Sequence, residues 1–235
     1  MANRNLLDPD IVDQLQVMPC RADLAYTAIR DAIGRGRISP GDWLRQGTLA
    51  EELNVSQVTV REALSRLVAE GLAVHVPYRG VQVVLLPVEE LEDVYDLRAL
   101  LEGFALKLAA KRISDEDLAR MRALLPETVV GAEPGTIDRA WKSNWEFHMI
   151  AIRASGRRHL ERFLEQLMRL TNPYAPLRER TEQERMEVAT GELEAHTRIV
   201  EALEAHDGEL AQTLITDHLQ TALSTLKACL EDKGN

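Results

Sequence analysis

Three histidines occupy positions from which a metal ion could be held. His148, His196 and His218 each fall within an apolar stripe of a separate predicted helix. A single histidine in such a stripe is usually a hydrogen-bonded core residue, but three in one core would need partners for six ring nitrogens. A divalent metal that binds one nitrogen of each ring meets part of this need, and imidazole suits Zn, Ni, Cu and Fe. Spacing alone leaves a shared metal site and separate core histidines about equally open.

Two other polar residues lie on the same kind of stripe. Asn144 is one turn before His148, and residues four apart stack along one helix face. Arg98 interrupts the stripe of a helix predicted from Val88 to Lys111, whose other members are Leu91, Val94, Leu101, Ala105 and Leu108. Both residues are therefore candidates for a polar site inside an apolar core.

A second set of residues has the spacing of a nucleic-acid reading surface. Thr48 with Glu51 forms a capping box, which predicts a helix starting at Leu49. Ser56 should cap a second helix that begins at Gln57. Two short helices joined by a tight turn are typical of proteins that place the second helix in a DNA groove.

A β-hairpin follows the second helix. Gly71 stops that helix, and two β-rich runs, LAVHV and GVQVVLL, flank the turn Pro77-Tyr78-Arg79-Gly80. The hairpin presents Arg79 at its tip, where it suits a minor groove or a phosphate. A helix predicted over Arg21 to Gly34 and a short strand at Trp43 and Leu44 complete this small unit.

Length and composition limit the remaining choices. The 235 residues, 45% of them hydrophobic, favour two domains with packed cores. Cys20 and Cys229 lie far apart with no paired spacing, which argues against a disulfide framework or a thiolate zinc site and fits a reducing cytoplasm. No stretch approaches the roughly 20 apolar residues of a membrane span, and the N-terminus lacks the pattern of a signal peptide. We expect a cytoplasmic protein with no membrane partner.

The charge is unevenly distributed along the chain. The net charge of −10 argues at first against nucleic acid, but residues 21–86 hold eight arginines, no lysine and seven acids, a balance of +1. Residues 87–235 hold 19 basic and 28 acidic residues, a balance of −9. A slightly basic reading head is thus joined to an acidic body, which repels DNA but could attract a cation.

The acidic part of the chain reads as helices throughout. Each predicted helix has one apolar stripe, which favours an antiparallel all-α bundle. We therefore expect a mainly α chain with an N-terminal extension at residues 1–20, a winged helix-turn-helix unit at residues 21–86 with a small β wing, and an all-helical unit at residues 87–235. The helices predicted in the last unit after that of Val88 to Lys111 run from Ser114 to about Val130, Thr136 to Ala154, Arg158 to Thr171, Glu182 to Ala205 and Glu209 to Leu230. Pro126 could bend or end the first of these.

Both parts resemble known families. The runs PGDWL, TLAEELNVS, VREALSRLVAEGL and RGVQV, in this order, resemble the winged helix-turn-helix of the GntR superfamily of bacterial transcription regulators. The runs VYDLRALLEGFALKLAAKR, NWEFHMIAIRASG, EAHTRIVEALEAHDGELA and DHL resemble the FCD effector domain of the FadR subfamily. One small reading head buries too little surface for high specificity, so we expect a homodimer that binds a double-stranded DNA operator with inverted-repeat symmetry.

The resemblance also implies which residues read DNA. Related regulators commonly use three arginines in this region, and only Arg61 matches here, because Gly47 and Gln57 occupy the other two positions. Gln reads adenine where Arg reads guanine, so we expect a shifted base preference at Gln57. Arg45 could recover a phosphate or base contact. The expected DNA-binding set is Arg45, Thr48, Ser56, Gln57, Thr59, Arg61, Arg79 and Gly80.

For the helical unit, the resemblance implies a metal site. Many FCD domains bind a metal through an Asp, a His one turn later and one His from each of the last two helices, positions that fall on Asn144, His148, His196 and His218. Asn in place of Asp removes a negative charge, which disfavours hard cations and leaves a bound ion its full charge. We expect Zn, with Ni, Fe or Mn as alternatives.

That full charge makes an anionic effector more important. A carboxylate of a small organic or sugar acid could complete the metal shell, with Arg98 as its second contact. An ion pair of Arg98 with Glu102 or Glu146 is the equally open alternative. The function expected is a ligand-responsive transcription regulator, commonly a repressor, and not an enzyme.

Two rival functions remain. Three histidines and an open coordination position also describe a metal-dependent hydrolase, but the chain has no evident general base. Alternatively, the same DNA-binding role could accompany a metal-free effector pocket, for instance for an acyl ligand.

Overall fold

The computed structural model describes the backbone of residues 20–128, 136–178 and 182–231. The chain divides into two compact units: one includes residues up to Asp31 and Trp43–Gln82, and the other includes Ala32–Asp42 and the chain from Val83 onward. The expected mainly α fold with a small β wing is confirmed. Among the described residues, no helix is long and apolar enough to cross a membrane.

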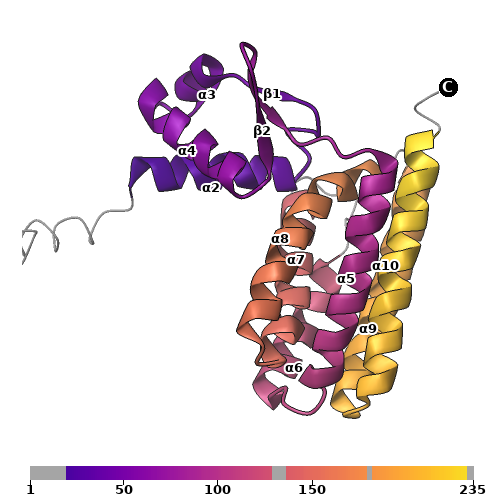
Figure 1. Cartoon of the computed structure of the whole chain (residues 1–235). Helices are drawn as coiled ribbons and strands as arrows, with labels where there is room; N and C mark the ends of the chain where they lie inside the picture. The colour runs from indigo at the N-terminus through magenta and orange to yellow at the C-terminus, as the bar shows by residue number, and fades with distance from the viewer. Residues whose placement is uncertain (1–19, 129–135, 179–181, 232–235) are drawn as a thin grey trace, which may run out of the picture. The chain divides into compact units, whose positions relative to one another are not determined.

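The first unit contains the helix-turn-helix and its wing (Figure 1). Its three strands form one sheet in the order β1-β3-β2, and β1 pairs antiparallel with β3 so that Trp43 faces Gln82 and Leu44 faces Val81. The apolar face of α4 packs inward through Val60, Ala63, Leu64 and Leu67. The elements are α2 (Arg21–Gly34), β1 (Trp43–Leu44), α3 (Gln46–Glu52), α4 (Gln57–Ala69), β2 (Ala73–Val76) and β3 (Gly80–Val83).

Local signals set most of these boundaries. Ser56 caps α4, and its Oγ accepts a hydrogen bond from the backbone N–H of Thr59 at 3.1 Å. Asn54, with φ 50°, makes the left-handed turn between α3 and α4, and Gly71, with φ 76°, follows the end of α4. The predicted start of α4 and its stop are both confirmed.

The predicted capping box of α3 is wrong. The helix begins at Gln46 rather than Leu49, and Arg45 occupies the N-cap position without a side-chain hydrogen bond. Because β1 ends at Leu44, the chain enters the helix at once, and Thr48 already lies within its first turn. Thr48 is exposed there and does not cap the helix.

The second unit is an all-α bundle, as expected. Ser114 caps α6, with its Oγ accepting from the N–H of Asp117 at 3.1 Å. The helix predicted to about Val130 ends at Leu124 and continues as a 3₁₀ turn, since Pro126 cannot donate to an α-helical ladder; Val130 lies outside the described residues. The elements are α5 (Val88–Ala109), α6 (Asp115–Leu124), η1 (Leu125–Glu127), α7 (Thr136–Ala154), α8 (Arg158–Thr171), η2 (Asn172–Arg178), α9 (Glu182–Glu204) and α10 (Gly208–Glu231).

Helix α5 is buried on several sides because it contacts α7, α8 and α10. The single stripe predicted for it is therefore too narrow: Tyr95, Ala99, Glu102 and Leu106 are also buried, whereas Val94, Leu101 and Leu108 are only half-buried. Gly103 lets α10 approach closely, since a Cβ at this position would lie 3.1 Å from Gln212 and 3.2 Å from Thr216.

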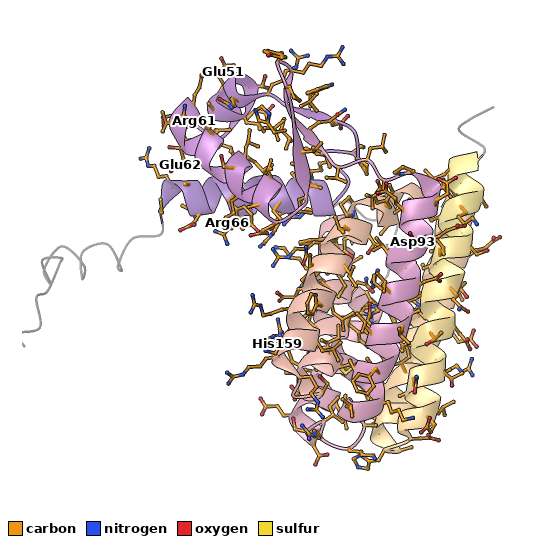
Figure 2. All side chains as sticks on the ribbon, viewed as in Figure 1. Glu51, Arg61, Glu62, Arg66, Asp93 and His159 are labelled. Atoms are coloured by element: carbon orange, nitrogen blue, oxygen red, sulfur yellow. The ribbon has the colours of Figure 1, made fainter. Side chains whose placement is uncertain are left out.

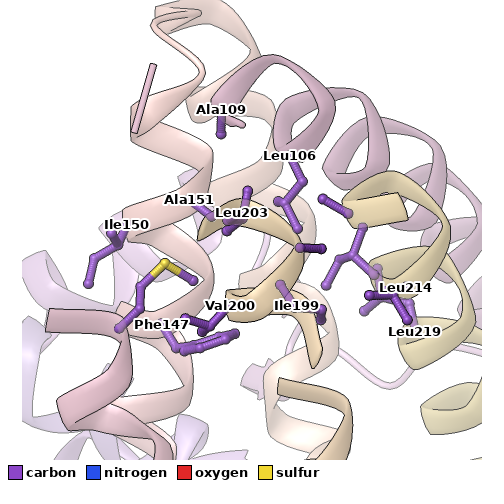
Figure 3. Packing of buried hydrophobic residues seen from close by; sticks show 14 of the residues in the cluster. Leu106, Ala109, Phe147, Ile150, Ala151, Ile199, Val200, Leu203, Leu214 and Leu219 are labelled. Carbon is purple, nitrogen blue, oxygen red and sulfur yellow. The ribbon is translucent and has the colours of Figure 1, made fainter. Parts of the chain in front are cut away.

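One apolar core joins α5, α7, α9 and α10 (Figure 3). Phe147 of α7 belongs to it together with Ile199 and Val200 of α9. The ring of Phe147 also lies 4.4 Å from that of His196, between centroids. The core thus continues directly into the histidines of the bundle.

Candidate metal centre and nucleic-acid interface

Helices α7, α9 and α10 bring the three histidines together. One ring nitrogen from each of His148, His196 and His218 lies within 4.8 Å of the other two. The ring centroids are 4.7 to 5.6 Å apart. The convergence that spacing could not establish is therefore present, and the three nitrogens are close enough to share one ion.

Each of the two buried rings has an outer partner. His148 Nδ1 lies 2.8 Å from Glu102 Oε2, and His196 Nδ1 lies 3.1 Å from Thr128 Oγ1. A histidine that ligates a metal usually donates its other nitrogen to such a partner, which fixes the tautomer and the ring orientation. The nitrogen that each ring would offer to an ion is therefore Nε2.

The carboxylate behind His148 is held in a buried network. Arg98 Nε donates to Glu102 Oε1 at 2.8 Å, and Arg98 Nη1 donates to Thr171 Oγ1 at 2.7 Å. Burial alone would raise the pKa of Glu102, but the charge of Arg98 and then the contact with His148 outweigh it and lower that pKa to about 2. Glu102 is consequently an ionised carboxylate with both oxygens engaged.

These contacts fix the orientation of the Arg98 side chain. Of the two acids considered for it, Glu102 is its partner, whereas Glu146 pairs with Arg120 and Arg153. An effector carboxylate would therefore have to share the Arg98 guanidinium with Glu102.

Asn144 supports the fit of a cation to this site. Its Oδ1 atom is buried and has no hydrogen-bond partner among the described residues. A buried amide oxygen without a partner is costly, and coordination would remove that cost. Asn144 and His148 lie one turn apart on α7, so an amide oxygen and an imidazole are available from the same helix face.

His218 connects the cluster to the surface. It is only half-buried and lines a groove of about 560 Å³ between α9 and α10. The charged residues of this groove are Glu187, Glu192, Arg198 and Asp217. A ligand can therefore approach the cluster from the side of His218, along a wall with more acids than bases.

In the first unit, the candidate DNA contacts lie at the surface. Gln57, Val58 and Arg61 are exposed in the first turns of α4. Arg61 is labelled in Figure 2. Arg61 forms no ion pair with the neighbouring Glu62, or with any other acid within the described ranges. Ser65 Oγ donates instead to the Arg61 carbonyl at 2.8 Å.

The wing brings further arginine to the same unit's surface. Arg45, Arg79 and Gly80 line one cavity of about 470 Å³ together with Trp43 and Gln46. Ser56 and Thr59 are engaged with each other, with their hydroxyl oxygens 2.8 Å apart, so their first role is to cap α4. The structure thus groups Gln57 with Arg61 on one helix, and Arg45 with Arg79 at the wing.

Two residues of the helical site were not identified in the sequence. Thr128 and Thr171 contact His196 and Arg98 across 68 and 73 residues of chain. Glu102 was considered only as a partner for Arg98, because its position four residues later on α5 suits that role. No local pattern links Glu102 to His148, because that contact joins α5 to α7.

Both units match models of known families. The FCD domain model matches residues 93–221, and that of the bacterial regulatory proteins of the gntR family matches residues 21–83. The HTH-type transcriptional regulator YdhC of Bacillus subtilis (strain 168) is 27% identical over 208 residues, which cover 88% of this chain and 91% of that protein. The HTH-type transcriptional repressor GlaR of Escherichia coli (strain K12) is 27% identical over 209 residues, covering 87% and 95%.

A solved structure shows the same likeness. That of E. coli McbR/YncC matches with a TM-score of 0.78 and 25% identity, covering 90% of this chain and 99% of the other. These similar proteins are transcription regulators and not enzymes. The hydrolase reading therefore has no support from them.

Proposed function

Because the chain belongs to the gntR family of bacterial regulatory proteins and carries their FCD domain, we propose that it is a repressor controlled by a small carboxylate. In this proposal a homodimer binds an inverted-repeat DNA operator in the cytoplasm. The FCD domain senses a small organic or sugar acid at a divalent metal ion. The observation that carries the proposal is the convergence of His148, His196 and His218 within 4.8 Å.

The outer partners support a metal more than three core histidines. Glu102 behind His148 and Thr128 behind His196 hold both Nδ1 atoms, so both rings are oriented for a ligand on Nε2. We propose Asn144 Oδ1 as a fourth ligand. Three imidazoles and an amide favour Zn, with Ni, Fe or Mn as alternatives.

The charge of the site determines the class of effector. Neutral ligands would leave a bound divalent ion its full charge, and the ion would attract a carboxylate. The groove beside His218 carries Glu187, Glu192 and Asp217 against Arg198, so its wall contributes little attraction for an anion. The effector would have to be drawn by the metal itself, with Arg98 as a further contact shared with Glu102.

The DNA-binding proposal rests on the exposed side chains of the first unit. We assign base contacts to Gln57 and Arg61, and contacts to the backbone or minor groove to Arg45, Thr48, Arg79 and Gly80, with Ser56 and Thr59 at the start of α4. Gln57 predicts an adenine at one operator position. The effector regulates only if it binds better to one arrangement of the two reading heads than to the other.

Thermal unfolding of the purified protein tests the proposal. A panel of small organic and sugar acids is added before and after chelation, to protein prepared without a His tag and analysed for metal. We expect one acid to raise the melting temperature of the metal-loaded protein alone, since a ligand at 100 times its Kd stabilises the native state by about 2.7 kcal/mol.

Variants separate the metal from the rest of the fold. His196→Ala should abolish metal uptake and the response to the acid, whereas His159→Ala, which changes an exposed histidine of α8, should leave both intact. Protein that holds no stoichiometric metal and takes up none would contradict the metal site. A response to an acyl ligand in that protein would favour a metal-free effector pocket.

A further inference from the structure

Helix α5 exposes an apolar line on its outer face. Leu97, Leu100 and Phe104 are 47%, 66% and 47% exposed, and their spacing of three and four residues places them on one side of the helix. Exposed leucines scattered singly need no explanation, but three aligned on one helix form a patch of the kind that contacts another molecule. We call the line from Asp93 to Lys107, with these three residues between, the α5 stripe.

The two ends of the α5 stripe carry opposite charges. Asp93 lies one turn before Leu97, and Lys107 lies three residues after Phe104. Asp93 is exposed, and within the described ranges it forms no ion pair (Figure 2). Lys107 forms an ion pair with the exposed Glu209 at 2.5 Å, and exposed pairs of this kind contribute little. Leu100 is midway, seven positions along the chain from either charge.

A neighbouring helix also exposes an apolar side chain. Phe163 of α8 is 61% exposed, and α8 packs against α5. The two helices run in opposite directions, since Arg98 in the first half of α5 contacts Thr171 at the end of α8. The start of α8, with exposed Arg157 and Arg158, therefore lies toward the Lys107 end. The face is acidic at one end, apolar in the middle and basic at the other.

We propose that the α5 stripe is the surface on which a second copy of this chain docks, with the two α5 helices antiparallel about a twofold axis near Leu100. In that arrangement Asp93 meets the partner's Lys107 and Lys107 meets the partner's Asp93. Leu97 and Phe104 then pack against each other across the axis. This deepens the proposed function, because it names the surface that would join the two copies of a dimeric repressor.

The charge order favours a second copy over an unrelated partner. In a twofold interface, residue i of one copy contacts residue j of the other, and residue j of the first contacts residue i of the second. The patch must therefore be complementary to itself. The α5 stripe has an acid at one end, three apolar residues in the middle and a base at the other end, at spacings of four, three, four and three. Two such stripes are complementary only when the helices are antiparallel. A parallel pairing would place Asp93 against the partner's Asp93.

Sedimentation equilibrium on the full chain over a wide range of concentration tests the surface. We expect wild type to sediment at twice the 26.4 kDa chain mass. Leu100→Asp should raise the dissociation constant by at least about 100-fold, because each variant change counts twice in a symmetric interface. The matched control is Leu210→Asp, which places the same charge at a 44% exposed leucine of α10 and should leave the dimer unchanged.

Charge reversal gives a second and independent test. Asp93→Lys should weaken the dimer by placing lysine against lysine, and Lys107→Asp should weaken it by placing acid against acid. The double variant restores opposite charges across the axis and should recover most of the lost affinity. Circular dichroism of each variant checks that the fold is retained, which the exposure of both positions favours.

The outcomes separate this inference from the proposed function. A dimer that is equally tight in Leu100→Asp and wild type would overturn the α5 stripe as the interface while leaving a dimeric repressor intact. A wild-type chain that stays monomeric at every concentration would overturn the inference as well, and operator binding measured on the same sample would report separately on DNA recognition. Failure of the double variant to recover affinity would overturn the antiparallel pairing.

Discussion

The two units hold their candidate functional side chains in opposite ways. In the first, Gln57 and Arg61 project from α4 into solvent. In the second, His148 and Glu102 are buried and joined to each other, and Glu102 is joined in turn to Arg98. An exposed contact residue can be exchanged with little effect on the fold, whereas each member of a buried polar network depends on the others. Recognition and stability should therefore separate in the first unit and coincide in the second.

The largest expected effect is on the stability of the second unit. Glu102→Gln keeps the shape of the side chain but leaves the charge of Arg98 buried without its carboxylate. Removing one partner of a buried pair typically costs about 3–5 kcal/mol. Chemical denaturation followed by circular dichroism should show a loss of this size. Glu209→Gln, which removes a 77% exposed carboxylate from its pair with Lys107, serves as control, and equal losses in both variants would contradict the comparison.

A smaller effect is expected one contact away from the proposed metal site. Thr128→Val keeps the branched shape and removes the hydroxyl beside His196 Nδ1. Losing such an outer partner typically lowers metal affinity by about 10–100-fold. Competition with a chromophoric chelator measures this affinity. A variant that binds metal as tightly as wild type would show that Thr128 does not orient His196.

In the first unit, recognition should weaken without loss of stability. Arg61→Ala is expected to cost about 1–3 kcal/mol of operator binding, as removal of a base-contacting arginine does. Fluorescence anisotropy at fixed salt measures the change, and the melting temperature should stay as in wild type. Arg66→Ala, on the same helix but paired with Asp23 and Glu70, should leave the discrimination between operator and unrelated DNA intact.

The smallest effect is a change of preference rather than of affinity. Gln57→Arg should move the preferred base at its operator position from adenine to guanine, because Arg binds the O6 and N7 edge of guanine. Selection from a randomised operator library reveals the preferred base. An unchanged preference would indicate that Gln57 faces the backbone and not a base edge.

Features that depend on residues close together in the sequence could be predicted, and features that depend on tertiary context could not. The starts of α4 and α6 were predicted because Ser56 and Ser114 cap them through residues three positions away. The start of α3 was missed because β1, and not the Thr48 capping pattern, sets where the chain turns helical. The cap signal was present at Thr48, but tertiary context overrode it.

The helical site shows the same division. His148, His196 and His218 could be named from their stripes, since a histidine at helical spacing among apolar residues is a local pattern. Their convergence could not be derived, because it depends on how three helices pack. Thr128 and Thr171 lie on no stripe that would single them out, and only packing brings them to His196 and Arg98.

Helix α5 carries both the buried network and the α5 stripe, on opposite sides of one rod. Leu97 and Arg98 are consecutive residues, the first 47% exposed and the second buried against Glu102. A helix is stiff about its own axis, so its two sides cannot rotate separately. Any rolling of α5 that accommodated a ligand at His148 and Glu102 would swing Leu97 and Leu100 by the same angle. Rotation of α5 about its own axis would then couple ligand binding at His148 and Glu102 to the angle between two copies of the chain.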